Sequence, residues 1–264
     1  MATVRDVYDY LDRLAPFHLQ MSFDNGGFLV GRGDRTVSKI LIALDITEEV
    51  VEEAALLGAE LIVSHHPVIF HPAKEMTDAS LTGRKLLALA ENRIAAICAH
   101  TNLDAVAGGV NDVLAQNLGL TATVLLRQDG VDPGGAPYGI GRVGEMAGEM
   151  DCAQFAAFVK ETLGANGVRY VEGGSPVRRV AVGGGSCSNM MGEVLAMGCD
   201  TFVTSDVKYD GFLDARAHGL NLIDAGHFPT ENIVCPIVAD WLKKGFPQCD
   251  IHLSTRHHEV FSYL

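Results

Sequence analysis

Three short apolar runs alternate with two helical segments between residues 39 and 100, and this alternation constrains the fold more than any other feature. The runs are "KILIALD", "LIVS" and "IAAICAH". Strands this apolar are buried on both faces, and strands separated by helices pair in parallel. In the first helical segment Thr47 can cap the helix, and Glu48 and Glu49 sit favourably in its first turn. The pattern predicts an α/β fold with a mainly parallel sheet covered by helices.

The same pattern returns in the second half of the chain. "KILIALD" aligns with "RVAVGGG", and "GAELIVSHH" aligns with "GCDTFVTSD", both at an offset of 140 residues. "CAHTNLD" then aligns with "DAGHFPTE" at an offset of 127, which matches His100 to His227 and Asp104 to Glu231. Identity between the halves is low, so a chance agreement between two α/β units remains an alternative.

The length and composition of the chain allow one large α/β domain or two smaller ones. A chain of 264 residues with 48% hydrophobic content can bury a large core. Residues 127–146 form the richest Gly/Pro stretch, which is typical of a boundary between lobes. We predict two similar α/β lobes, residues 1–126 and 147–264, joined by the linker 127–146 into one compact unit.

Charge and hydropathy limit the partners of the protein. The formal net charge is −13 and no basic run is present, so a nucleic-acid polymer is not an expected partner. A small-molecule substrate, even an anionic one, is compatible with this charge if bound metal ions reverse the local sign.

No apolar run approaches the roughly 18 residues that span a membrane, and the first residues do not resemble a secretory signal. We therefore expect a cytoplasmic protein, with its six scattered cysteines reduced and packed in the core.

The ends of three predicted strands carry the residues most suited to chemistry, because parallel sheets bind ligands beyond the carboxyl ends of their strands. These residues are His65 and His66, His100 and Asp104, and His227 and Glu231. Imidazole and carboxylate together suit divalent Zn, Mn, Fe, Co or Ni, and a carboxylate can bridge two ions. Adjacent histidines at the end of one strand are expected to point in opposite directions, so each could serve a different ion.

The other candidates have simpler interpretations. A single histidine is more often a structural group than a ligand, which we expect for His18, His71, His218 and His252. The pair His257 and His258 lies in "STRHHEVFSYL", which we predict as an edge strand. The glycines of "VAVGGGSCSNM" could hold an anion or form a tight turn, and both interpretations stay open. A catalytic serine at Ser64 or Ser186 lacks the G-x-S-x-G elbow.

Several blocks of the sequence, taken in order, resemble a known family. They are "DNGGFLVG", "LIVSHHPVIFHP", "AHTNLDAVAGGVND", "VAVGGGS" and "SDVKYDGFLDARAHGLNLIDAGHFPTE". Together they resemble the dinuclear-metal-centre hexamer family, the Nif-three-like proteins, often labelled "GTP cyclohydrolase I type 2 homologue". The resemblance runs from about residue 3 to the C-terminal end of the sequence. It implies a toroidal homohexamer whose metal sites face an internal cavity.

The resemblance also implies a ligand set with two divalent metal ions per chain. His66 and Asp104 would hold one ion, His65 and His227 the other, and Glu231 would bridge both. His100 is not a ligand in this pattern. The chain departs from the pattern at Asp210, where relatives often have histidine, and at Gly183, where they often have cysteine. It also lacks the inserted middle domain of longer members and is similar to the short form.

These observations predict a metal-dependent hydrolase that acts on a small anionic or nucleotide-like substrate through an activated water. His100 or Asp206 would relay protons. The cyclohydrolase label fits this chemistry, but it comes from the resemblance alone. Phe70, Tyr209 and Phe228 could stack on a base or simply pack. The alternative is a non-catalytic hexamer with a metal-binding, metal-handling or regulatory role.

Overall fold

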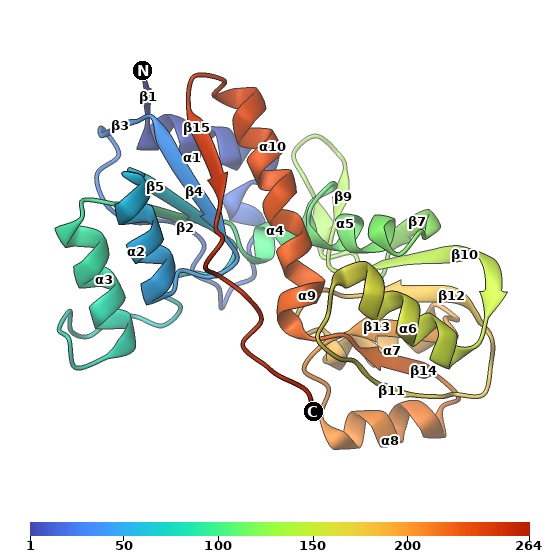
Figure 1. Cartoon of the computed structure of the whole chain (residues 1–264). Helices are drawn as coiled ribbons and strands as arrows, with labels where there is room; N and C mark the ends of the chain where they lie inside the picture. The colour runs from blue at the N-terminus through green and yellow to red at the C-terminus, as the bar shows by residue number, and fades with distance from the viewer. The chain divides into compact units, whose positions relative to one another are not determined.

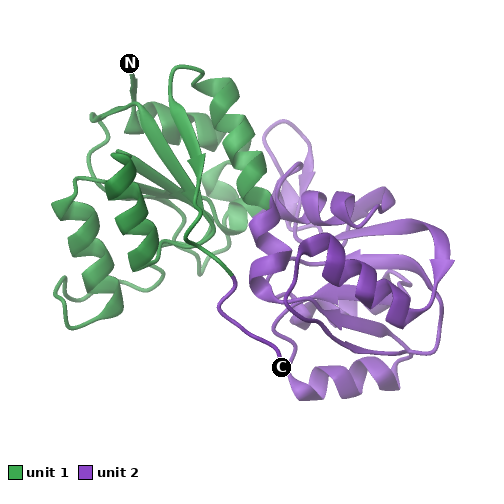
Figure 2. Ribbon diagram, viewed as in Figure 1, with its two compact units in different colours: residues 1–103, 234–258 green, residues 104–233, 259–264 purple.

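The computed structural model describes residues 1–264, and the chain folds into two compact units (Figure 2). Unit 1 comprises Met1–Leu103 and Val234–His258, and unit 2 comprises Asp104–Ile233 and Glu259–Leu264. These divisions differ from the lobes expected from the sequence, because the chain returns to unit 1 after Ile233. The returning segment supplies β15 (Asp250–Leu253), which pairs in parallel with β4 (Lys39–Ala43).

Unit 1 is built on a five-stranded sheet with the order β15-β4-β5-β6-β2 (Figure 1). Its remaining strands are β5 (Leu61–Ser64), β6 (Ala95–Cys98) and β2 (Gly27–Val30). The first four strands in this order are parallel, and β2 is antiparallel to β6. A separate ribbon joins β1 (Ala2–Thr3) to β3 (Thr36–Val37). The predicted parallel arrangement of the three apolar runs is confirmed.

Helices cover this sheet. They are α1 (Val4–Leu14), α2 (Glu48–Leu57), α3 (Leu81–Glu91) and α10 (Cys235–Gly245), with a 3-10 turn, η1 (Phe17–Leu19). Helix α2 begins as predicted, since Thr47 Oγ1 accepts a hydrogen bond from Val50 N at 3.2 Å. Apolar residues of α2 and α3 pack in one cluster with Leu41, Ile62 and Ala96 of the sheet. Helix α10 contacts β15 and β4, on the side away from α2 and α3 (Figure 1).

Unit 2 contains a six-stranded mixed sheet with the order β11-β14-β13-β12-β10-β7. The strands are β7 (Thr121–Leu125), β10 (Arg142–Met150), β11 (Arg169–Val171), β12 (Val177–Val182), β13 (Thr201–Thr204) and β14 (Asn221–Asp224). The central strands β12, β13 and β14 are parallel, and the other pairs are antiparallel. The expected linker, residues 127–146, contributes the hairpin β8 (Gly130–Val131) and β9 (Pro137–Tyr138) and the start of β10.

The helices of unit 2 lie on both faces of this sheet. They are α5 (Val110–Asn117), α6 (Cys152–Leu163), α7 (Met191–Ala196), α8 (Tyr209–Ala217) and α9 (His227–Glu231), with the 3-10 turns η2 (Ser188–Met190) and η3 (Asn232–Val234). Apolar residues of α5 and α6 form one core cluster with β12, β13 and β14. The short helix α4 (Thr101–Ala105) carries the chain from unit 1 into unit 2.

Strand pairing supports the internal repeat. Ile40 of β4 pairs with Leu61 of β5, and Val180 of β12 pairs with Thr201 of β13. Each residue of the second pair lies 140 positions after its counterpart in the first pair, which is the predicted offset. For the third strand, Leu61 pairs with Ala95 of β6, and its counterpart Thr201 pairs with Asn221 of β14. The offset between these third strands is therefore 126 residues. The predicted offset of 127 therefore holds for the histidines and is wrong for the strand. One additional residue lies in the turn after β14.

The segment after β15 differs from the predicted edge strand. The ladder ends where Ser254 N donates to Ile42 O at 2.8 Å. The next amide, Thr255 N, donates to the Glu53 carboxylate at 2.8 Å. A side chain thus replaces the neighbouring strand as acceptor, and residues 254–264 adopt no regular structure. No helix of the molecule has the length and apolar character that crossing a membrane requires.

Candidate functional site

Strand β5 ends at Ser64, and the two histidines that follow lie close together. The N–H groups of His65 and His66 both donate to Leu44 O, at 3.2 and 2.9 Å. The centroids of their rings are 5.0 Å apart. The prediction that they point in opposite directions is wrong, because the alternation of a strand does not continue beyond its last residue.

His100 follows β6 and joins this pair. The centroid of its ring lies 5.2 Å from that of His65 and 5.4 Å from that of His66. Metal-binding atoms of the three side chains lie within 4.8 Å of one another. Imidazoles at this spacing can hold one ion together or serve two adjacent ions, which lie about 3.5–4 Å apart in two-metal sites.

An oxygen atom holds each of these three imidazoles in one orientation. His65 Nδ1 lies 2.8 Å from Ala99 O, and His66 Nδ1 lies 2.8 Å from Asp45 Oδ1. His100 Nδ1 lies 2.7 Å from Asp24 Oδ1. Carbonyl and carboxylate oxygens only accept, so Nδ1 carries the proton in each ring and Nε2 carries the lone pair. Nε2 is therefore the atom that could bind a metal, and the oxygen partners raise its basicity.

The sequence did not point to Asp24 and Asp45, although they orient two of the three histidines. The side chain of Asp24 is inaccessible to solvent, and it also accepts hydrogen bonds from Thr101 N at 3.0 Å and from Thr101 Oγ1. Burial raises the pKa of Asp24, but the hydrogen bonds from His100 and Thr101 outweigh it and lower the pKa to about 2. Asp24 is therefore a permanent anion at neutral pH.

We expect Asp24→Asn to lower the free energy of unfolding at pH 7 by about 2 kcal/mol, the free energy that corresponds to the shift of this pKa from 3.8 to about 2. The folded-state pKa is the lower one, so this stabilisation is present above about pH 4 and is lost as the pH falls towards 2. Urea unfolding between these pH values measures the difference. Asp34→Asn, at an exposed pair with Arg32, is the control and should change little. A loss that does not shrink at low pH would contradict the assignment.

In unit 2, His227 and Glu231 occupy the first and last positions of α9, one helical turn apart. His227 Nε2 lies 3.0 Å from Glu231 Oε2. The other ring nitrogen, Nδ1, lies 2.6 Å from Asp206 Oδ2. Asp206 has a left-handed backbone with φ of 55°, which is uncommon for a residue with a side chain. Asp206, which the alignment of the two halves placed opposite His66, thus orients His227 in the way that Asp24 orients His100.

Asp104 also belongs to unit 2 and lies near Glu231. A carboxylate oxygen of Asp104 and one of Glu231 lie within 4.8 Å of each other. Asn111 on α5 fixes the backbone here, since its Nδ2 donates to Asp104 O at 3.0 Å and its Oδ1 accepts from Gly184 N at 3.0 Å. Two buried carboxylates at this distance repel each other unless a proton or a cation lies between them.

The glycine block forms a tight turn, and its backbone N–H groups are used within unit 2. Gly183 N donates to Val203 O at 2.9 Å, and Gly185 N donates to Thr230 Oγ1 at 3.0 Å. The anion-binding interpretation is therefore wrong. Gly185 has φ of 63°, and a Cβ atom there would lie 2.0 Å from Glu231 Oε1. This position needs glycine because the backbone passes directly beside the carboxylate.

Comparison with known proteins places the chain in a family. The model of the DUF34/NIF3 family, described as NGG1p interacting factor 3, matches residues 2–260. The chain belongs to this family. It is 36% identical over 242 residues to a "GTP cyclohydrolase 1 type 2 homolog" of Clostridium perfringens, with 91% of each chain covered. It is 37% identical over 261 residues to a protein of the same name from Streptomyces coelicolor, covering 97% of this chain and 88% of the relative.

A solved structure confirms the fold of the family. The Bacillus cereus protein related to NIF3 superposes with a TM-score of 0.94 at 27% identity, covering 100% of this chain and 99% of that one. The predicted membership and the predicted α/β fold are thus confirmed. The candidate His, Asp and Glu groups lie on loops and short helices that follow the parallel strands of each unit.

Other residues that the sequence raised lie apart from these groups. Tyr209 and Asp210 are exposed at the start of α8. Phe70 is partly exposed, and its ring centroid lies 6.1 Å from that of His100. His257 was not among the predicted site residues, but its Nε2 lies 2.9 Å from Asp45 Oδ2. In this family member, a histidine far along the chain is thus connected to the residue that orients His66.

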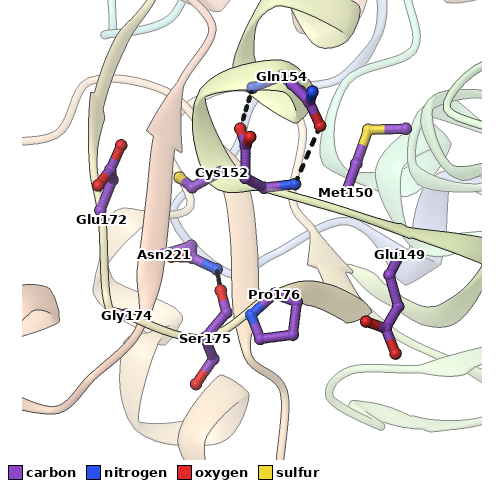
Figure 3. Close-up of a pocket in the computed structure, with 10 residues that line it drawn as sticks. Glu149, Met150, Cys152, Gln154, Glu172, Gly174, Ser175, Pro176 and Asn221 are labelled. Atoms are coloured by element: carbon purple, nitrogen blue, oxygen red, sulfur yellow. Dashed lines mark hydrogen bonds between the residues drawn. The ribbon is translucent and has the colours of Figure 1, made fainter.

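A pocket of about 430 Å³ in unit 2 contains none of the predicted site residues (Figure 3). Its lining includes Glu149, Asp151, Cys152 and Glu172. Burial raises the pKa of the Cys152 thiol to about 11, and Glu172 and Asp151 raise it further in the same direction. The thiol therefore stays protonated, which makes it a poor nucleophile and a poor metal ligand.

Proposed function

We propose that this protein binds two divalent metal ions and uses them to hydrolyse a small anionic substrate. The proposed ligands are His65, His66, Asp104, His227 and Glu231. The observation that supports this proposal most is the orientation of the imidazoles. In His65, His66 and His227, Nδ1 lies within 2.8 Å of an oxygen atom, which directs Nε2 toward a ligand position.

The positions of the proposed ligands along the chain support the proposal. Asp104 is the first residue of unit 2 and follows the unit 1 residues of α4 without interruption. Glu231 lies just before the point at which the chain returns to unit 1. We assign His66 and Asp104 to one ion, His65 and His227 to the other, and Glu231 to both, as the family resemblance implies.

The ions would polarise the substrate and lower the pKa of a bound water from its bulk value of 15.7 to about 7. His100 would then accept a proton at Nε2, because Asp24 holds the other ring proton on Nδ1. Asp206 would keep His227 in the orientation that a ligand needs. Its side chain is 45% exposed, so Asp206 could also pass a proton to solvent.

The names of the relatives suggest a nucleotide as the substrate. The proteins from Clostridium perfringens and Streptomyces coelicolor are named as homologues of GTP cyclohydrolase 1 type 2. Opening a purine ring also needs an activated water, which is the chemistry proposed for this site.

Oligomerisation belongs to the same proposal. We expect a homohexamer, which sedimentation velocity on the full chain would detect.

The test loads purified protein with Zn²⁺, Mn²⁺, Fe²⁺, Co²⁺ or Ni²⁺ and screens GTP, phosphoesters and cyclic amides. We expect turnover with at least one metal, and none above background for the double variant His66→Ala, Glu231→Ala. Elemental analysis of the native protein provides an independent measurement. The metal site itself would be rejected if the native protein contained well under one metal ion per chain and also bound none when metal was added. Metal without turnover would leave a binding or regulatory role.

A further inference from the structure

One carboxylate in unit 1 connects a proposed metal ligand to a second histidine. Asp45 Oδ1 lies 2.8 Å from His66 Nδ1, and Asp45 Oδ2 lies 2.9 Å from His257 Nε2. The side chain of His257 is only 9% exposed, whereas that of Asp45 is 38% exposed. Both carboxylate oxygens of Asp45 thus have an imidazole partner, which fixes the plane of the carboxylate.

His257 is held in place by a short segment that we call the strap, residues 254–258. Glu53 on α2 anchors the strap. Its buried carboxylate accepts hydrogen bonds from Thr255 N and Thr255 Oγ1, both at 2.8 Å, and from Ser254 Oγ. The Ser254 hydroxyl in turn accepts from His257 N at 3.3 Å. The strap is therefore a compact turn closed around one buried acid.

We propose that the strap positions His66 for metal binding, with Glu53 holding the strap and His257 fixing the carboxylate that orients His66. This inference depends on the proposed metal site. A partly exposed carboxylate with one partner can rotate or take up water. With His257 on its second oxygen, Asp45 keeps the Nδ1 of His66 as donor and Nε2 as the ligand atom. His257 is a positioning residue, since it acts on His66 only through Asp45.

The test compares His257→Ala with His258→Ala in the full chain. His258 is the adjacent residue of the strap and is exposed, so it provides a matched control. Competition with a chromophoric chelator would measure Zn²⁺ affinity. We expect His257→Ala to weaken the binding of one ion about 10-fold, which is the lower end of the effect seen when a residue that supports a metal ligand is removed. We expect His258→Ala to leave the affinity unchanged. His257→Gln should regain most of the affinity, because its amide nitrogen can donate to Asp45 from a similar place.

A second readout needs no metal. In the metal-free protein, ¹⁵N chemical shifts of the His66 ring report which nitrogen carries the proton. We expect His257→Ala to shift this equilibrium away from Nδ1–H, with no change for His258→Ala. If the wild-type protein binds no Zn²⁺, the proposed function fails, while this spectrum still tests the strap. If both variants match the wild-type protein, or if both lose affinity equally, the positioning role of His257 is rejected.

Discussion

Replacing Glu231 with alanine is expected to weaken metal binding by about 100-fold or more and to remove any hydrolytic activity. Glu231 is buried, and its Oε2 lies 3.0 Å from the Nε2 of His227. As the proposed bridge it would contact both ions, so its loss removes a ligand from each. This exceeds the 10- to 100-fold effect that is typical of residues that only support a ligand.

The same substitution should affect stability to an extent that depends on the metal. Glu231 and Asp104 have carboxylate oxygens within 4.8 Å, so the metal-free protein contains a repulsive pair. Glu231 also pairs with the His227 imidazole at 3.0 Å, and the loss of this contact offsets the relief of the repulsion. We therefore expect the metal-free Glu231→Ala variant to differ little in stability from the metal-free wild type. Added Zn²⁺ should stabilise the wild type by about 4 kcal/mol at 1,000 times Kd, and the variant much less.

Thermal unfolding with and without Zn²⁺ measures both expectations. Glu161→Ala, on the exposed face of α6, provides a control for the loss of one negative charge. Equal stabilisation of wild type and Glu231→Ala by Zn²⁺ would show that Glu231 is not a ligand. Stabilisation of neither protein would reject the metal site instead.

The sequence predicts the central strands and the residues at their ends, because both depend on local pattern. Apolar runs of four or five residues between helices specify β4, β5 and β6, and the repeat specifies β12 and β13. The candidate residues His65, His100 and His227 lie within three residues of the ends of β5, β6 and β14. Parallel pairing brings the ends of β5 and β6 to one edge of their sheet, which accounts for the proximity of His65 and His100.

The partners of these residues could not be predicted in the same way. Asp24 meets His100 across 76 positions of the chain, and His257 meets Asp45 across 212. Contacts over such distances leave no periodic signal in the sequence, and the contact of His257 with Asp45 also depends on the return of the chain to unit 1. Asp206 is the exception, because the repeat aligns it with His66 and so marked it for attention. Even the offset between the halves was wrong by one residue at β14, since a turn can lengthen without changing the strands around it.

The role of the glycine block gives the second large expected effect. Gly185→Ala should weaken metal binding about as strongly as the loss of Glu231, although residue 185 offers no ligand atom. A Cβ atom at this position would lie 2.0 Å from Glu231 Oε1 and 3.2 Å from His227 Nε2. The carboxylate must therefore move by more than an ångström, or the turn must open and release the hydrogen bond from Gly185 N to Thr230 Oγ1.

Gly198→Ala provides a matched control, because it separates this clash from backbone strain. Gly198 has φ of 69°, close to the 63° of Gly185, but a Cβ atom there meets nothing within 4 Å. Both substitutions cost about 1 kcal/mol for the left-handed backbone. Zn²⁺ titration and urea unfolding of the two variants should therefore show a similar backbone cost, with the loss of metal affinity confined to Gly185→Ala. If Gly198→Ala lost affinity equally, general destabilisation would explain the effect. If Gly185→Ala bound Zn²⁺ as the wild type does, Glu231 would have to bind from a position other than the one it occupies beside the turn.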